Sequence, residues 1–319
     1  MKVKITEIEF YLPKTIETLE LLKNTNLEWD MHSIEEKTGI NKRFVTKNNE
    51  TALDLGIKAA NKISKEKLLQ IDNLIYVTQS PEYALPTTAC IIQQKLNLNN
   101  NVSCFDINQG CAGFVYALAV GGSMISNRIS KKTLIICSDT YSKYIPKNDR
   151  TNRPIFSDGA SAILIEMNDK ESLKKFSFQT FGDGYKDLIV ENSGSNFNNK
   201  KGKPKLFMNG NKVLMFTMSK LPDFILKFLK DNNLNINNID KFIFHQASKI
   251  ILENLRRKLN IHKNKIPLNY DKYGNTVSSS IPILMKDLLD QNKIKKNENL
   301  LLIGFGVGLS LGIALVRWP

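Results

Sequence analysis

Cys111 is the residue whose position in the sequence best suits it for chemistry. It follows a predicted strand over 102–108 and opens the small and apolar run AGFVYAL, which predicts a helix. A thiol at this turn lies at a helix N-terminus, where unpaired N–H groups and the helix dipole stabilise a thiolate. This matters because a free thiol with a pKa of about 8.5 is only a few per cent ionised at neutral pH. From this pattern alone, Cys111 is equally compatible with a nucleophile and with an inert core cysteine.

His245 and Asn275 stand where polar side chains could reach a ligand. His245 ends a predicted strand over 242–246, and Ser248 predicts the N-cap of the helix that follows. Open α/β sheets bind ligands at the carboxyl ends of their strands. Asn275 lies in the turn YGNT, ahead of a helix rich in small residues. Taken singly, each residue also has a structural interpretation, as a histidine at a strand end and as an ordinary turn asparagine.

The elements that must position these residues alternate between short apolar runs and amphipathic stretches of helical length. This alternation is the signature of an α/β protein, and near-continuous apolar strands are typical of sheets buried on both faces. The polar stretch 191–211 predicts a long loop. The sequence predicts strands at 74–78, 102–108, 133–139, 161–167, 242–246, 300–306 and 312–318, and helices at 51–70, 86–96, 111–127, 212–232, 248–260 and 277–292.

The two halves of the chain contain segments of similar sequence. The segment IDNLIY at 71–76 aligns with IDKFIF at 239–244, and TLII at 133–136 corresponds to NLLL at 299–302 at nearly the same offset. Two matches at one offset predict a duplicated α/β unit. We therefore expect an N-terminal half over 1–170, which holds the cysteine, and a C-terminal half over 171–319, which holds the histidine, the asparagine and a glycine loop.

Composition and charge exclude several classes of protein. The net charge of +14 comes from 45 Lys and Arg against 31 Asp and Glu, but no nucleic-acid-binding motif accompanies it, so a solvated lysine surface is expected. The four cysteines form no CxxC pair and the three histidines have no zinc-ligand spacing, so no metal site is predicted.

The uncharged stretch Leu300–Val316 is short for a membrane-spanning helix of about 20 residues, and its glycines favour two strands. No signal peptide is predicted, and we expect a reduced, cytoplasmic protein without membrane contact.

Several motifs in order along the chain resemble the β-ketoacyl-acyl-carrier-protein synthase III family of the thiolase superfamily. They are EKTGINKR at 36–43, ALPTTACIIQQKL at 84–96, NQGCAGFVYAL around Cys111, FSDGASA at 156–162, FHQAS around His245, YGNTVSSSIP around Asn275 and the terminal GFGVGLSLGIALVRW. The resemblance implies an α/β fold, a five-layer αβαβα sandwich built from two similar halves.

The resemblance also implies a mechanism. Cys111 would attack an acyl-CoA and keep the acyl group, while His245 and Asn275 would stabilise the enolate formed when a malonyl thioester loses CO₂. The backbone N–H groups of Cys111 and Val307 would form the oxyanion hole. The substrates would be CoA and acyl-carrier thioesters, the acidic malonyl-carrier protein among them, and no further cofactor is implied.

The chain departs from the family pattern at positions that bind CoA, the carrier or the acyl group. Arg150 and Lys37 fall at CoA-binding positions, with Lys37 in place of an arginine. A usual tryptophan is replaced by Ser33, with Trp29 one helical turn earlier. On the face that docks the carrier, Lys249 stands beside an isoleucine, Ile250, that replaces an arginine. Leu85 replaces a phenylalanine that reaches the partner's acyl pocket in a homodimer.

Three other interpretations compete with a condensing enzyme. A non-decarboxylating acyltransferase of the same fold would move the acyl group from Cys111 to an amine or hydroxyl. The order cysteine, histidine, asparagine also occurs in papain-like proteases, but the segment around Cys111 lacks their CGSCW-type motif. The third interpretation, a nucleic-acid-binding protein, rests on the positive charge alone, and a salt-dependent binding assay would detect such binding.

Overall fold

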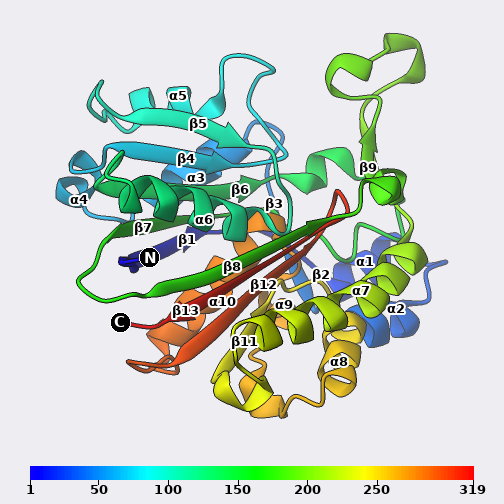
Figure 1. The fold of residues 1–319 in the computed structure, drawn as a ribbon. Coiled ribbons are helices and arrows are strands. Elements are labelled where there is room, and N and C mark those ends of the chain that lie inside the picture. The colour runs from blue at the N-terminus through cyan, green and yellow to red at the C-terminus, as the bar shows by residue number, and fades with distance from the viewer.

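The computed structural model describes residues 1–319, which form two main sheets with helices between and outside them (Figure 1). The strands are β1 (Val3–Tyr11), β2 (Thr15–Thr18), β3 (Lys42–Val45), β4 (Asn73–Val77), β5 (Ser103–Ile107), β6 (Lys132–Asp139), β7 (Gly159–Met167), β8 (Leu173–Thr180), β9 (Leu188–Glu191), β10 (Lys205–Met208), β11 (Lys241–Phe244), β12 (Asn299–Gly306) and β13 (Ser310–Arg317). The helices are α1 (Leu19–Thr25), α2 (Met31–Thr38), α3 (Ala52–Ala60), α4 (Lys65–Leu69), α5 (Thr88–Lys95), α6 (Gly113–Ser126), α7 (Gly210–Asp231), α8 (Lys249–Lys258), α9 (Tyr270–Tyr273) and α10 (Ser280–Asp290).

The two main sheets share one strand order. The first runs β1-β7-β6-β4-β5 and the second β8-β13-β12-β11, so each strand of the second has a counterpart and only β5 has none. The directions agree as well, because β4 and β6 are parallel like β11 and β12, and the other two corresponding pairs in each sheet are antiparallel. Asp72 and Asp240, which the internal alignment equates, both accept a backbone N–H at the start of the neighbouring strand.

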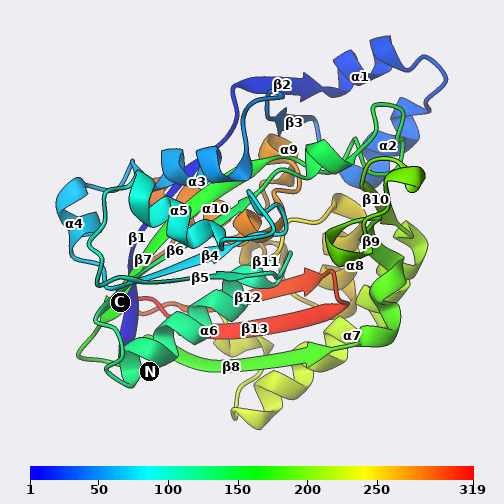
Figure 2. The ribbon, with the colours of Figure 1, turned by 90° about the horizontal axis from the view of Figure 1, so that it is seen from above.

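Three apolar clusters between successive layers hold the sandwich together. Helices α3 and α5 cover the outer face of the first sheet, and α7 and α8 cover the outer face of the second. The central cluster joins both sheets through α6 and α10, which lie between them (Figures 1 and 2). Because α6 contacts a sheet on each side, it is apolar around most of its circumference. The five-layer αβαβα sandwich is therefore confirmed.

The predicted strands are all present, and the uncharged stretch at 300–316 forms β12 and β13 as expected. Two main-sheet strands, β1 and β8, were not predicted. Both are edge strands in which charged and apolar residues are mixed, so neither shows the continuous apolar run that marks the inner strands. Helices α1 and α2 were also not predicted.

Three predicted segments need correction. The helix expected over 51–70 is two helices, since Asn61 ends α3 in a tight turn and Ser64 begins α4. The loop expected over 191–211 contains β10, which pairs with β9, and the segment between them stands out from the body (Figure 1). The helix expected over 277–292 begins as a short 3₁₀ turn, and α10 starts at Ser280. No helix in the structure is both long enough and apolar enough to cross a membrane.

Candidate active site

Cys111 lies in the turn between β5 and α6 and is 5% exposed. The end of β12 passes directly over it. A Cβ added at Gly306 would lie 3.0 Å from the Cys111 sulfur, and one at Gly304 would lie 2.5 Å from the Cα of Ala112. The absence of side chains at these two glycines is therefore what lets the second sheet approach the turn that holds Cys111.

The surroundings of Cys111 hold its thiol in the protonated state. Burial, together with the nearby Asp139 carboxylate, raises the pKa of Cys111 to about 12. Hydrogen bonds from the backbone N–H groups of Cys111 and Val307 act in the opposite direction. Helix α6 begins two residues later, as expected, but the stabilised thiolate expected from that position is not found, because desolvation outweighs the backbone donors.

These same N–H groups are the two predicted for the oxyanion hole. Hydrogen bonding to both N–H groups lowers the pKa of Cys111. Val307 belongs to the turn between β12 and β13, so the second sheet supplies one of the predicted donors and the turn that holds Cys111 supplies the other. An oxygen bonded to a carbon on this sulfur would have two backbone donors beside it.

His245 follows the last residue of β11 and is 1% exposed. Its backbone N–H donates to the Ile303 carbonyl at 2.8 Å, which fixes the residue to β12. Its ring packs edge-on against Phe305, with centroids 5.4 Å apart, and its Nδ1 lies 2.6 Å from Ser280 Oγ. Burial lowers the pKa of His245 to about 3, so the ring is neutral at physiological pH.

Asn275 is held by its backbone and by one end of its side chain. Its backbone N–H donates to the Ile155 carbonyl at 3.0 Å, and its carbonyl accepts from the Ser157 N–H at 2.8 Å. The side-chain Oδ1 accepts from the Val277 N–H at 2.9 Å. The Nδ2 group makes no hydrogen bond within the protein, so it is the end of the amide that is left to donate.

The structure brings Cys111, His245 and Asn275 to one place. His245 and Asn275 both lie beside the backbone of Val277, which raises the pKa of His245 and donates its N–H to Asn275 Oδ1. Phe305, which contacts the His245 ring, directly precedes Gly306 and Val307, which contact Cys111. One apolar cluster surrounds the sulfur, and its buried members are Cys111, Tyr141, Phe156, Leu188, Leu206, Val277 and Leu309.

A buried polar network beside the cysteine was missed in the sequence. Asp139 accepts from the Gln79 backbone N–H at 2.7 Å and from the Ser278 hydroxyl at 2.6 Å, and burial raises the pKa of Asp139 to about 7. The Tyr141 hydroxyl donates to the Gln79 side-chain carbonyl. Asp139 ends β6 and Gln79 follows β4 by two residues, so their place at the carboxyl ends of parallel strands was the signal available.

Two predicted CoA-binding residues line one cleft of about 700 Å³, Lys37 from α2 and Arg150 from the loop before β7. Ile155 and Met208 line the same cleft and also pack against the cluster around Cys111, so the cleft borders that cluster. Trp29 is buried and does not line the cleft, whereas Ser33 does.

The remaining predicted contact residues lie on the surface. Lys249 is exposed in the first turn of α8 and packs over Gly39, which ends the neighbouring α2. Leu85 is 83% exposed in the single chain.

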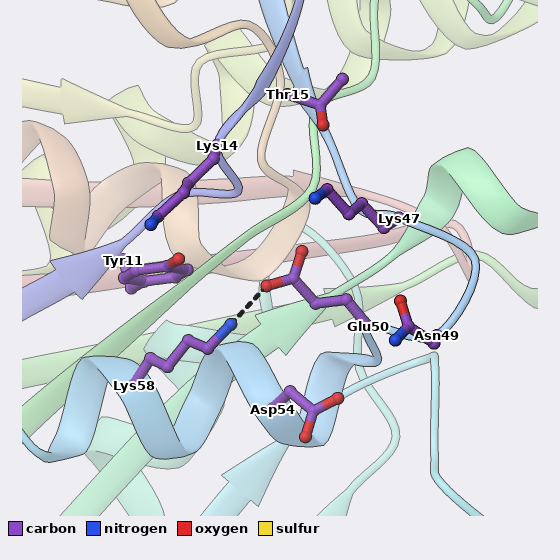
Figure 3. Close-up of a pocket in the computed structure, with 8 residues that line it drawn as sticks. All are labelled: Tyr11, Lys14, Thr15, Lys47, Asn49, Glu50, Asp54 and Lys58. Carbon is purple, nitrogen blue, oxygen red and sulfur yellow. Dashed lines mark hydrogen bonds and ion pairs between the residues drawn. The ribbon is translucent and has the colours of Figure 1, made fainter.

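A separate cleft of about 340 Å³ contains none of the predicted site residues (Figure 3). It lies between the end of β1 and the start of α3, and its charged groups partly satisfy one another, since Lys58 donates to Glu50 at 2.5 Å. Nowhere in the chain do three His, Cys, Asp or Glu side chains gather where they could hold a metal ion.

The sequence and the fold both match known proteins. The family model described as 3-Oxoacyl-[acyl-carrier-protein (ACP)] synthase III matches residues 105–196, and the model of its C-terminal part matches residues 229–318. The β-ketoacyl-[acyl-carrier-protein] synthase III of Clostridium tetani is 34% identical over 338 residues, which cover 99% of this chain and 98% of that protein. The corresponding Coxiella burnetii protein is 32% identical over 321 residues, which cover 98% of each.

Solved structures agree with these relatives. A crystal structure of a 3-oxoacyl-(acyl-carrier-protein) synthase III has a TM-score of 0.93 and 32% identity, covering 100% of both chains. A 3-oxoacyl-(acyl-carrier protein) synthase from Burkholderia xenovorans has a TM-score of 0.92 and 29% identity, covering 100% of this chain and 94% of that one. With this identity along nearly its whole length, the chain belongs to the 3-oxoacyl-[acyl-carrier-protein] synthase III family.

Proposed function

We propose that this chain is an acyltransferase that condenses an acyl-CoA starter with a malonyl thioester and releases CO₂. The observation that carries the proposal is the arrangement at Cys111, where the neutral ring of His245 and the unpaired Nδ2 of Asn275 accompany two backbone donors at the sulfur. The names of the relatives support the same reaction.

In the first half-reaction, Cys111 attacks the thioester carbonyl of acyl-CoA. The N–H groups of Cys111 and Val307 stabilise the oxyanion of the tetrahedral intermediate, a contribution of about 3 kcal/mol per donor in comparable sites. The C–S bond to CoA breaks, and the thiol proton of Cys111 leaves with the CoA sulfur. The products are acyl-Cys111 and free CoA.

In the second half-reaction, the malonyl thioester places its carbonyl oxygen between His245 and Asn275. Loss of CO₂ leaves an enolate, whose negative oxygen accepts hydrogen bonds from the ring N–H and from Nδ2. The enolate carbon then attacks acyl-Cys111, and the β-ketoacyl thioester leaves. The Cys111 thiolate takes a proton from solvent and returns to the resting thiol.

The substrates are proposed from the surfaces around this centre. Lys37 and Arg150 supply positive charge to the cleft that would hold the phosphates of CoA, and Lys249 presents a charge to an acidic malonyl-carrier protein. Trp29 is proposed only to support this cleft from beneath. CoA and acyl-carrier thioesters are the proposed substrates, with no cofactor, in the cytoplasm.

A homodimer is proposed from two features of the first half, residues 1–170. The edge strand β5 has unpaired backbone groups, and the half-buried Phe105 and Ile107 lie on it. The exposed side chains of Leu85 and Tyr83 follow β4, which is the strand next to β5. In a dimer joined along β5, Leu85 would enter the acyl pocket of the partner. Within each chain, the second half, residues 171–319, would supply His245 and Asn275.

Intact-protein mass spectrometry after incubation with a panel of acyl-CoAs tests the first half-reaction. We expect one acyl adduct, on Cys111, that is absent in Cys111→Ser. An adduct mapped to Cys90, Cys104 or Cys137 instead would overturn this step.

Labelled malonyl thioester tests the second half-reaction. The native protein should release CO₂, and Asn275→Ala should slow this release about 100-fold while acyl-Cys111 still forms. If the native protein transfers its acyl group to an amine or hydroxyl without releasing CO₂, the non-decarboxylating acyltransferase replaces the condensing enzyme.

A further inference from the structure

Ser280 is the only side chain that hydrogen-bonds to the ring of His245. The two groups come from different elements, since His245 follows β11 and Ser280 begins α10. Their Nδ1 and Oγ atoms are 2.6 Å apart, and the two residues are 1% and 2% exposed. With bulk water excluded, the protons of this pair must find their partners within the protein.

A count of donors and acceptors decides which atom donates. The backbone N–H of Gln246 already donates to Ser280 Oγ at 3.4 Å, and the Ser280 hydroxyl has no acceptor other than Nδ1. A proton on Nδ1 would aim two donors at Oγ and leave the hydroxyl proton buried without an acceptor, which is a costly arrangement. A hydroxyl that donates to Nδ1 satisfies all three groups.

We propose that Ser280 is a positioning residue that locks His245 as the tautomer with its proton on Nε2. A neutral imidazole has one N–H, and the nitrogen that carries it decides whether the ring donates to a substrate oxygen or opposes it with a lone pair. The inference rests on the proposed function for the use of this donor, while the tautomer itself is a property of the free protein.

The electrostatics of the site support this assignment. Burial lowers the pKa of His245 to about 3, so the ring does not gain a second N–H by protonation at physiological pH. The neighbouring Val277 backbone acts in the opposite direction and raises the pKa of His245, but burial outweighs it. Since Nδ1 accepts from Ser280, the single N–H of the neutral ring is on Nε2.

Asn275 is oriented by the same kind of contact. The Val277 N–H occupies its Oδ1 and leaves its Nδ2 to donate. The turn over 277–280 therefore sets both side chains in their donor orientations, one through a backbone N–H and the other through a serine hydroxyl.

Nitrogen NMR of the free protein labelled with ¹⁵N-histidine tests the tautomer without any reaction. The chain has only three histidines, so the His245 signals can be assigned by their loss in His245→Gln. We expect a protonated Nε2 and an unprotonated Nδ1 in the native protein. A proton on Nδ1 would overturn the proposal even if the enzyme condenses malonyl thioesters.

Substitutions of nearly equal shape isolate the hydroxyl. Ser280→Thr keeps it and Ser280→Val replaces it with a methyl, so both add similar bulk to a buried position. Ser280→Thr should keep the native tautomer, whereas Ser280→Val and Ser280→Ala should show an increased population with the proton on Nδ1. An unchanged tautomer in both hydroxyl-free variants would overturn the role of Ser280.

Kinetics then connect the tautomer to the reaction. Ser280→Val should release CO₂ from malonyl thioester at least tenfold more slowly than Ser280→Thr, while both form acyl-Cys111 at equal rates. Ser279→Ala is the control, because the Ser279 hydroxyl donates to the Cys137 carbonyl and makes no hydrogen bond to the ring. Equal CO₂ release by the Thr and Val variants would overturn the role of the hydroxyl in catalysis. A native protein that shows the Nε2 tautomer but releases no CO₂ would refute the proposed function and leave the tautomer assignment standing.

Discussion

At the scale of single residues, the chemistry of Cys111 depends on a carboxylate that is far from it in sequence. Asp139 is fully buried at the end of β6, and its negative charge is one of the causes that raise the pKa of Cys111. Burial in turn raises the pKa of Asp139 to about 7, so this charge changes within the physiological range. Ionisation of Asp139 therefore disfavours ionisation of Cys111.

Removal of the Asp139 charge should make Cys111 easier to ionise. In Asp139→Asn, iodoacetamide should alkylate Cys111 faster than in the native protein at pH 8, because the thiol pKa is lower. Peptide mapping measures this rate, and the exposed Cys90 in the same chain provides the reference rate. An unchanged ratio of the two alkylation rates would show that the coupling is negligible.

The same carboxyl group should contribute to the pH dependence of stability. The pKa of Asp139 is about 7 in the folded protein, against a model value of 3.8, so between these values the folded state binds a proton that the unfolded state has lost. Its contribution to the unfolding free energy is therefore present below pH 4 and falls, by at most about 4 kcal/mol, as the pH rises to 7. Urea unfolding at pH 5 and pH 8 should show a smaller fall in Asp139→Asn than in the native protein, and equal falls would contradict the assignment.

At the scale of elements, the end of β12 is the part of the second sheet that completes the site. Its glycines let it lie against the nucleophile turn, and its continuation supplies the backbone N–H of Val307. The contact joins the two sheets at the proposed nucleophile. Packing of one element thus decides both the burial of Cys111 and the position of a proposed oxyanion-hole donor.

A methyl group at Gly304 should disrupt this contact. Its Cβ would lie 2.5 Å from the Cα of Ala112, and a backbone atom cannot move aside as the end of a side chain can. We expect Gly304→Ala to lower the unfolding free energy by about 3 kcal/mol in urea denaturation. Gly182→Ala is the matched control, because its added Cβ meets nothing within 4 Å, and it should be near neutral. Equal stability of the two variants would mean that β12 does not press on this turn.

At the scale of the whole molecule, the two sheets differ by one strand. The strand without a counterpart is β5, and it leaves an open edge on the first sheet. The exposed Leu85 and Tyr83 come from the chain that follows the neighbouring β4. The edge and these side chains together form the surface proposed for the homodimer.

A charged residue at position 85 should separate assembly from folding. Leu85→Asp should keep the native unfolding free energy, because the side chain is 83% exposed in the single chain. It should also weaken the dimer in sedimentation and reduce acylation of Cys111 by long acyl-CoAs, since Leu85 is proposed to enter the partner's pocket. A native protein that is a fully active monomer would refute the proposed dimer.

The sequence by itself determined the elements whose signal is local. Continuous apolar runs identified β4, β6, β12 and β13, because a strand buried on both faces needs apolar residues at every position. The motifs around Cys111, His245 and Asn275 identified the family. The edge strands β1 and β8 were missed because their mixture of charged and apolar residues resembles a loop or a helix face as much as a strand.

The tertiary structure alone decided the chemical state of the site residues. The pKa of Cys111 depends on burial beneath β12 and on Asp139, and the donor end of His245 depends on Ser280, which is 35 residues away in sequence. Burial and hydrogen bonding act through space, so no local pattern around the cysteine or the histidine contains them. The sequence identified the proposed reacting groups, and the packing of the two sheets set their protonation and orientation.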